Sequence, residues 1–341
     1  MPRTTLSPTP SRMQIYRSLD EVPAVYGPTV ATIGNFDGVH RGHRWVIAEV
    51  IRRARELGGH SLAITFDPHP ARLLRPDVPL RLITPLEKKL QLLAATGIDA
   101  ALVLPFTQEL SQMTAGDFAS KVLHDKLNII ELHEGENFRF GYQAQAGVDS
   151  LDAFGRELGF RVSVYTPRST HGLAVSSSAI RQLITQGNVS RARALLGRPF
   201  AISSTPAPGR GYGTKYTVPT INLAPYPELI PAIGVYIATL TVGGETFDAV
   251  TNVGNRPTFG ADSFTIESHL LNFRPIELNE STPLTLTFLH RLRDEIRWPS
   301  PEALREQIGR DVRRAQRFFS LCRLLALPSQ EPGSRSATSP R

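Results

Sequence analysis

The string TVATIGNFDGVHRGH, from Thr29 to His43, joins an apolar, β-prone run to a helical pattern through a glycine-bearing turn. A helix N-terminus offers unpaired N–H groups and the positive end of the helix dipole, which together hold phosphate oxygens. His40 and His43 lie three residues apart, on one face of the first helical turn. Two imidazole donors there could stabilise the charge that builds up on a nucleotide's phosphates under attack. The string therefore predicts nucleotidyl transfer.

Two further strand patterns end in residues that suit ligand binding. Asp67 and His69 follow the run SLAITF, at the carboxyl end where α/β sheets bind ligands, although two prolines could simply stop the strand there. Asn137 follows the run IIELHEG, with Phe138 and Phe140 two residues apart. These rings could stack on a flat ligand, but aromatic residues in a core are commoner.

The string AVSSSAIRQLI places three serines at a predicted helix start, with Arg181 in the first turns. Hydroxyls, free N–H groups and a guanidinium together make a phosphate cradle. An ordinary helix cap needs only one serine, so the extra hydroxyls favour the cradle.

The second half of the chain offers a phosphate loop and oxygen ligands. Gly209, Gly211 and Gly213 alternate in GRGYGTK, which gives a backbone able to close over phosphates. If Thr220 to Asn222 is extended, the Thr hydroxyl and the Asn amide oxygen point to one side and suit Mg²⁺ bound to a nucleotide. Taken alone, the same residues fit the start of an edge strand with two solvated polar groups.

Glu267 is the candidate base. It lies in FTIESHLL, where β alternation places Thr265, Glu267 and His269 on one face. Phosphorylation of a primary alcohol needs a group that accepts the hydroxyl proton beside metal-held ATP, although Glu267 would also fit as a solvated surface residue. Arg256, in the turn of TNVGNRPTFG just upstream, could approach a phosphate.

Composition bounds the class of protein. The 341 residues favour two domains, and 41% hydrophobic with 20% charged residues is typical of a soluble globular chain. A net charge of +7 favours polyanionic partners, but the basic residues are spread over helices as solvated faces. No apolar run reaches membrane-spanning length, and the single cysteine, Cys322, excludes an internal disulfide. We therefore expect a cytoplasmic protein.

The chain changes character once. From Val30 to Leu196, short apolar runs alternate with helical patterns, which predicts a doubly wound parallel sheet in an α/β domain over residues 14–196. Residues 197–326 contain long β-prone runs and then a helical pattern from Pro299 to Phe319, which predicts an antiparallel β-barrel with a C-terminal helix. Residues 1–13 and 327–341 are predicted to be disordered tails.

The order of these strings resembles that of the bacterial bifunctional riboflavin kinase/FAD synthetases. GNFDGVHRGH, TFDPHP, GENFRFG, SSSAIR, PTIN, NVGNRPTF and IESHLLNF occur in the family's order, over about residues 14 to 320. The resemblance implies a Rossmann-like HxGH nucleotidyltransferase domain that adenylylates FMN, followed by a riboflavin kinase barrel. ATP would be the co-substrate and Mg²⁺ the cofactor, and the partners would be riboflavin and FMN, with neither nucleic acid nor membrane. A monomer or weak oligomer is expected.

The resemblance also implies roles for particular residues. Glu267, His40 and His43 would be catalytic, and Thr220 and Asn222 would bind the metal. Flavin would contact Asn137, Phe138, Arg256 and Arg293. The implied ATP phosphate-binding residues are Gly34, Asn35, Phe36, Gly38, Ser177, Ser178, Arg181, Gly209, Gly211 and Gly213.

Two departures from the family pattern and two rival functions accompany this interpretation. Ser178 stands where the family usually has Thr, which keeps a hydroxyl. Thr217 replaces a glycine of the kinase phosphate loop but leaves three other glycines, so it bears on kinase efficiency more than on kinase identity. One rival is an HxGH adenylyltransferase for another acceptor, such as pantetheine phosphate or nicotinamide mononucleotide, with a supporting or degenerate barrel. The other rival is an RNA-binding protein, against which the lack of a concentrated basic and aromatic stripe argues.

Overall fold

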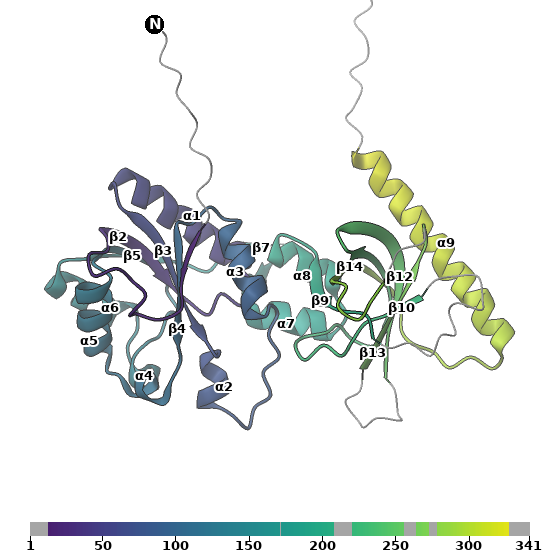
Figure 1. Ribbon diagram of the computed structural model, residues 1–341, viewed down its shortest axis with the longest axis horizontal. Helices are drawn as coiled ribbons and strands as arrows, with labels where there is room; N and C mark the ends of the chain where they lie inside the picture. Colours follow the sequence, from purple (N-terminus) through teal and green to yellow (C-terminus); the bar gives the residue numbers. More distant parts are fainter. Residues whose placement is uncertain (1–12, 171, 208–219, 256–263, 273–277, 327–341) are drawn as a thin grey trace, which may run out of the picture. The chain divides into compact units, whose positions relative to one another are not determined.

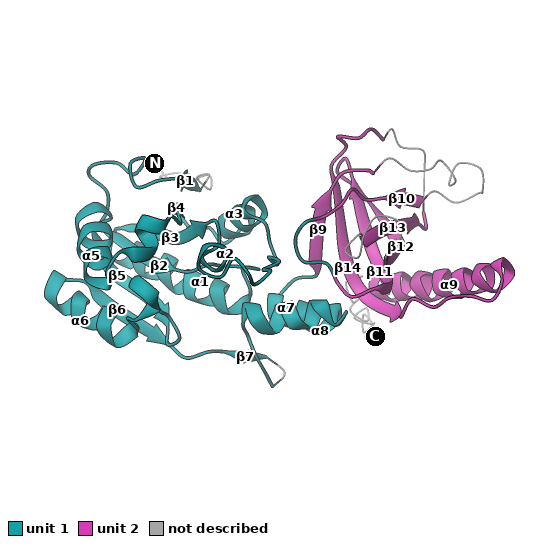
Figure 2. Cartoon of the chain, turned by 90° about the horizontal axis from the view of Figure 1, so that it is seen from below, with its two compact units in different colours: residues 1–199, 227–230 teal, residues 200–226, 231–341 magenta. Residues whose placement is uncertain are grey.

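The computed structural model describes residues 13–170, 172–207, 220–255, 264–272 and 278–326. These residues form two compact units, shown in different colours in Figure 2. Unit 1 contains the described residues up to Pro199 together with Pro227–Ile230, and unit 2 contains the rest. The predicted tails lie outside the described residues except for Met13, whose side chain is buried in the core of unit 1.

Unit 1 is built on a six-stranded sheet in which every pairing is parallel. In spatial order its strands are β1 (Gln14–Tyr16), β4 (Ala100–Pro105), β3 (His60–Asp67), β2 (Thr29–Ile33), β5 (Ile129–Gly135) and β6 (Arg161–Tyr165). The apolar runs predicted between Val30 and Leu196 are thus confirmed as strands, and β1 was not predicted. The strand order reverses between β2 and β5, so the ligand crevice of such a sheet lies at the carboxyl end of β2.

Helices cover both faces of this sheet (Figure 1). On one face α1 (Arg41–Glu56) and α3 (Leu86–Ala94) bury apolar residues against β3 and β4. On the other face the π-helix η1 (Phe118–Lys126) and α6 (Val148–Leu158) do the same. The predicted doubly wound α/β fold is therefore confirmed.

Shorter elements complete unit 1. They are α2 (Pro70–Leu74), α4 (Gln108–Gln112), α5 (Ala115–Asp117), the 3₁₀ turn η2 (Tyr142–Ala144), the β7 (Ser169–Thr170) and β8 (Leu173–Ala174) pair, α7 (Ser177–Thr185) and α8 (Val189–Leu196).

Unit 2 is an antiparallel sheet that curls into a partly closed barrel. In spatial order its strands are β10 (Thr220–Asn222), β13 (Phe264–Leu270), β12 (Glu245–Asn255), β11 (Gly234–Val242), β14 (Leu284–Arg293) and β9 (Phe200–Ser204). The residues that follow β9 pair with the end of β10, which joins the two outer strands of the sheet. Ala207 N donates to Asn222 O at 2.8 Å, and Ala224 N donates to Thr205 O at 2.8 Å. The predicted antiparallel barrel is confirmed.

The C-terminal helix α9 spans Pro301–Ala326. It buries Ala315 and Phe319 against Val235 and Ile237 of β11, which explains its amphipathic pattern. The helix continues seven residues past the predicted end at Phe319, because the sequence after it, SLCRLLA, contains no glycine or proline to stop it. No helix among the described residues is both long and apolar enough to cross a membrane.

Candidate active sites

His40 and His43 meet at the N-terminus of α1, directly after the strand at the centre of the sheet. His40 is the N-cap residue, and its Nδ1 accepts a hydrogen bond from the backbone N–H of His43 at 3.3 Å. The two rings stack with centroids 3.5 Å apart and planes 17° from parallel. The predicted shared face of the first turn is confirmed.

Both histidines are neutral near pH 7. Burial lowers the pKa of His40 to about 4, partly opposed by Asp37. Burial, and then the neighbouring His40, lower the pKa of His43 well below its usual value. Because Nδ1 of His40 accepts an N–H, its neutral ring carries the proton on Nε2, where it can be donated to a phosphate oxygen.

Asp37 lies in the turn between β2 and α1, residues 34–40, which is here called the phosphate turn after its predicted role. Its side chain connects this turn to other parts of the site. Its side chain is 3% exposed, and its Oδ1 and Oδ2 accept hydrogen bonds from the backbone N–H groups of Thr84 at 3.0 Å and Ile83 at 3.1 Å. Oδ2 also accepts from Arg181 Nη2 at 2.8 Å, and the backbone carbonyl accepts from Ser177 Oγ at 2.8 Å. One carboxylate therefore joins the phosphate turn, the loop before α3 and the start of α7.

The start of α7 differs from a free phosphate cradle. Ser176 is the cap, since its Oγ accepts from Ala179 N at 3.2 Å. Ser177 and Arg181 both bond to Asp37, and Arg181 Nε also donates to the carbonyl of Arg81 at 3.1 Å. These contacts place both residues beside the phosphate turn, and their role in binding triphosphate stays a prediction, as it does for Ser178.

The glycine turn supplies its backbone more than its side chains. The ring of Phe36 is 3% exposed and lies in the core, edge-on to His43 at 5.2 Å. The N–H of Gly38 donates to Thr84 Oγ1 at 3.0 Å, and that of Gly34 to the carbonyl of Ile64 at 2.9 Å. The predicted contacts of these residues and of Asn35 with phosphate would therefore involve other backbone groups or a rearranged turn.

Lys89 is a site residue that the sequence interpretation missed. The Nζ of Lys89, in α3, reaches Thr65 Oγ1 at 2.9 Å and the carbonyls of Asn35 at 3.2 Å and Phe66 at 3.4 Å. It lines a small pocket with Asn35, Asp67 and His69. Burial lowers its pKa to about 8, so it remains mostly cationic at pH 7. The available signal was a lysine on the apolar face of α3, next to the buried Leu90 and Leu93.

Of the two aromatic residues after Asn137, one is a core residue and the other is partly accessible to a ligand. Phe138 and Phe140 stack with ring centroids 5.5 Å apart. Phe140 belongs to the core cluster, whereas Phe138 is half-buried and Asn137 is exposed. The role of Phe138 and Asn137 in contacting flavin stays a prediction, and Phe140 packs against the ring of Phe138.

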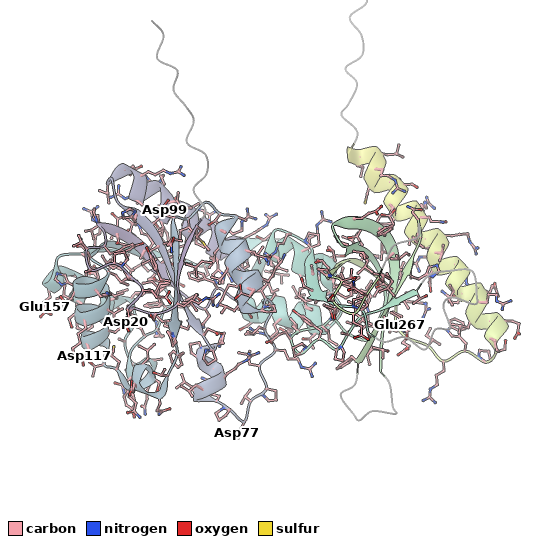
Figure 3. All side chains as sticks on the ribbon, viewed as in Figure 1. Asp20, Asp77, Asp99, Asp117, Glu157 and Glu267 are labelled. Atoms are coloured by element: carbon pink, nitrogen blue, oxygen red, sulfur yellow. The ribbon has the colours of Figure 1, made fainter. Side chains whose placement is uncertain are left out.

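In unit 2 the predicted residues gather on one face of the sheet. Glu267 of β13, labelled in Figure 3, pairs in register with Asn222 of β10 and with Asn252 of β12. Directly paired residues of adjacent antiparallel strands put their side chains on the same face. Glu267 therefore lies in a row between two amides, and Thr220 pairs with His269 in the next row.

Except for Asn222, the residues of these rows form the floor of a cavity of about 400 Å³. Thr220, Glu267 and His269 line it from the sheet, and Leu304 and Ile308 line it from α9. This volume and the mixture of apolar wall and polar floor suit a small organic substrate.

Arg293 forms part of the wall of the same cavity. Its Nε donates to Asp311 Oδ2 at 2.8 Å, and its guanidinium lies 5.7 Å from the ring centroid of Trp298. Arg293 is thus fixed beside an aromatic ring at the predicted flavin site. Arg256, the glycines of the phosphate loop (Gly209, Gly211 and Gly213) and Thr217 lie outside the described residues.

The oxygen atoms of Thr220 and Asn222 fit a hard cation. Asn222 Oδ1 is buried and has no hydrogen-bond partner among the described residues, so it is available as a ligand. The described part of the chain contains no group of three His, Cys, Asp or Glu residues placed for a metal. A magnesium ion at this site would therefore rely on ATP phosphates for most of its charge neutralisation.

Comparison with known proteins agrees with this geometry. Residues 23–179 match the family model for FAD synthetase, and residues 196–319 match that for riboflavin kinase. The chain is 35% identical to a bifunctional riboflavin kinase/FMN adenylyltransferase of Pseudomonas fluorescens, over 93% of this chain and 99% of that protein. It is 33% identical to the protein of the same name from Escherichia coli K12, over 86% and 93%.

A solved structure shares the fold. The crystal structure titled macrolide-efflux protein from Streptococcus pneumoniae matches with a TM-score of 0.80 and 24% identity, over 89% of this chain and 99% of that one. This likeness supports the arrangement of elements within the units and carries no information about activity.

An HxGH site on a parallel sheet and a carboxylate in a cavity on an antiparallel barrel define a two-domain, nucleotide-dependent transferase. With both family models and relatives matched along most of its length, the chain belongs to the bifunctional riboflavin kinase/FMN adenylyltransferases. The prediction of flavin cofactor biosynthesis is confirmed. The match of the second half to riboflavin kinase disfavours the rival with a merely supporting barrel.

The lowered pKa of His40 predicts acid sensitivity. Between pH 6.5 and about 4, the unfolded chain binds a proton at His40 that the folded chain does not bind. The free energy of unfolding is therefore unaffected by this residue above pH 6.5 and decreases as the pH falls below it. The loss approaches about 1.4 kcal/mol per pH unit. Thermal unfolding from pH 4 to 8 should show a steeper acid decline for wild type than for His40→Asn; parallel curves would contradict this.

Proposed function

We propose that unit 2 phosphorylates riboflavin at the cavity floored by Glu267. Glu267 accepts the proton of the riboflavin 5′-hydroxyl as its oxygen attacks the γ-phosphorus of ATP, which gives FMN and ADP. The observation that supports this most is the position of Glu267 on the floor of a cavity of about 400 Å³, in register with Asn222, whose Oδ1 has no hydrogen-bond partner among the described residues. The flavin ring would lie against Arg293 and Trp298.

Unit 1 then adenylylates FMN. A phosphate oxygen of FMN attacks the α-phosphorus of a second ATP, and pyrophosphate leaves. The FMN phosphate is already ionised near pH 7, so no general base is needed. Neutral His40 and His43 donate hydrogen bonds to phosphate oxygens, and Lys89 adds positive charge where negative charge builds up. Positioning of the substrates and electrostatic stabilisation of the transition state account for most of the rate enhancement.

Magnesium would be held in unit 2 by Thr220, Asn222 and the ATP phosphates. When bound, the ion neutralises phosphate charge and orients the γ-phosphoryl group. The substrates are riboflavin, FMN and ATP. We propose a cytoplasmic, monomeric or weakly associating enzyme without nucleic-acid or membrane partners, a location that the ATP requirement and the single cysteine support.

A magnesium titration tests the ligand assignment and the kinase site together. Wild type given riboflavin, ATP and Mg²⁺ should form FMN and then FAD on a chromatogram, and excess EDTA should stop FMN formation. Asn222→Ala should raise the Mg²⁺ concentration for half-maximal FMN formation by about tenfold, since one direct ligand is lost. Exposed Asn279 supplies the control, Asn279→Ala. An unchanged Mg²⁺ requirement in Asn222→Ala would rule out this ligand.

A further inference from the structure

A short segment of the second half of the chain is built into unit 1. Residues Pro227–Ile230, here called the strap, lie inside the sequence that matches riboflavin kinase, yet they pack as part of the adenylyltransferase unit (Figure 2). Glu228, Leu229 and Ile230 are 8%, 4% and 7% exposed. A carboxylate is costly to bury without partners, so the contacts of Glu228 require an explanation.

The strap occupies both backbone groups of Leu82. Glu228 Oε2 accepts the N–H of Leu82 at 2.7 Å, and Leu229 N donates to the carbonyl of Leu82 at 3.1 Å. Glu228 Oε1 accepts from Arg72 Nη2 at 2.5 Å, which joins α2 to the same point. The strap therefore fixes one edge of the segment that leads into α3.

The opposite edge of that segment holds the phosphate turn. The carbonyl of Arg81 accepts from Arg181, and the N–H groups of Ile83 and Thr84 donate to the carboxylate of Asp37. Thus Leu82 bonds to the strap, while its neighbours on both sides bond to Asp37 and Arg181. Residues 81–84 lie between the strap and the turn as a strand lies between its two partners.

The turn held in this way is the one that leads to His40. Besides binding Asp37, Thr84 accepts the N–H of Gly38 through its Oγ1 at 3.0 Å. A displacement of residues 81–84 would move Asp37 and Gly38 together, because these bonds are buried and have no solvent to replace them. The connection from Glu228 to the turn is therefore continuous, with no unbonded step.

We propose that Glu228 is a positioning residue for adenylyl transfer. Through residues 81–84 it sets the position of the phosphate turn and of Arg181, although it belongs to the half of the sequence that matches the kinase. The inference rests on the proposed adenylyl site at His40 and His43. This role of Glu228 has a consequence for chimaeric proteins. Replacement of the kinase half by that of a related protein would alter FAD synthesis unless residues 227–230 were kept.

The test measures the two reactions separately in the full-length protein. Glu228→Ala should raise the KM for ATP in FAD formation from supplied FMN by about tenfold, the effect of one lost charge-assisted hydrogen bond. Kinase kcat and KM should stay unchanged. Glu228→Gln keeps an acceptor for Leu82 N–H and should recover most of the affinity for ATP. Glu280→Ala, at an exposed glutamate of unit 2, is the matched control.

The contradicting results are distinct. If Glu228→Ala lowers only kcat, with the KM for ATP unchanged, fewer molecules are folded and the positioning role is wrong. An unchanged KM and kcat would also overturn it. Asp37→Asn and the double variant His40→Ala/His43→Ala are run in parallel. If both keep wild-type FAD synthesis, the proposed adenylyl site itself fails, whereas if both lose it while Glu228→Ala is silent, only the inference on the strap fails.

Discussion

Replacement of both His40 and His43 by alanine will lower FAD formation from supplied FMN by about a thousandfold or more, since removal of one such donor costs 10²–10³ in rate. The two stacked rings are neutral and fixed at the N-terminus of α1, with His40 buried and His43 half-buried, so they offer donors without reorganisation. Riboflavin phosphorylation by the same molecules should be unchanged. Chromatography of flavin products with FMN or riboflavin as substrate measures both rates.

The control for this variant is His124→Ala, at a half-exposed histidine of unit 1 that pairs with Asp125. It should leave both rates at the wild-type level. If the double variant at His40 and His43 retained more than a tenth of the wild-type rate of FAD formation, the adenylyl site would have to lie elsewhere in unit 1.

Glu267→Gln will have the second large effect, a loss of about 10²–10⁴ in FMN formation, which is the contribution expected of a general base. The amide keeps the size of the side chain and one acceptor oxygen beside Asn222 and Asn252, so the cavity should keep its shape. What is lost is the ability to accept the proton of the 5′-hydroxyl. FAD formation from supplied FMN should proceed at the wild-type rate.

The matched control is Glu280→Gln, which neutralises an exposed carboxylate of the same unit. Riboflavin phosphorylation that survives in Glu267→Gln at more than half the wild-type kcat would assign the base to another group.

The two folds could be predicted because the hydrophobic pattern of each strand matches the way in which that strand is buried. Buried parallel strands appear as continuous apolar runs, as in Thr29–Ile33, and half-buried antiparallel strands alternate, as in Phe264–Leu270. Helix α9 was predicted too short, since nothing local ends it at Phe319. Strand β1 was missed because three residues carry little periodicity.

The site was predictable only where its chemistry is local. His40 and His43 are neighbours on one helical turn, which their spacing in the sequence predicts. The alternation of polar and apolar residues in FTIESHLL likewise predicts the face of the sheet on which Glu267 lies. Lys89 and Asp37 reach the site through contacts with residues far along the chain, such as Asp37 with Arg181, and no spacing rule reveals such pairs. The strap is the extreme case, since Glu228 and Leu82 are 146 positions apart.

Labelled ATP tests the central claim, that one chain performs two phosphorus transfers at two sites. Wild type given riboflavin should place label from [γ-³²P]ATP in FMN, and label from [α-³²P]ATP in FAD but never in FMN. Glu267→Gln should lose the γ-label in FMN while still placing α-label in FAD from supplied FMN, and the double histidine variant should do the reverse. Label from the α-phosphorus in FMN, or loss of both transfers in either variant, would contradict the two-site account.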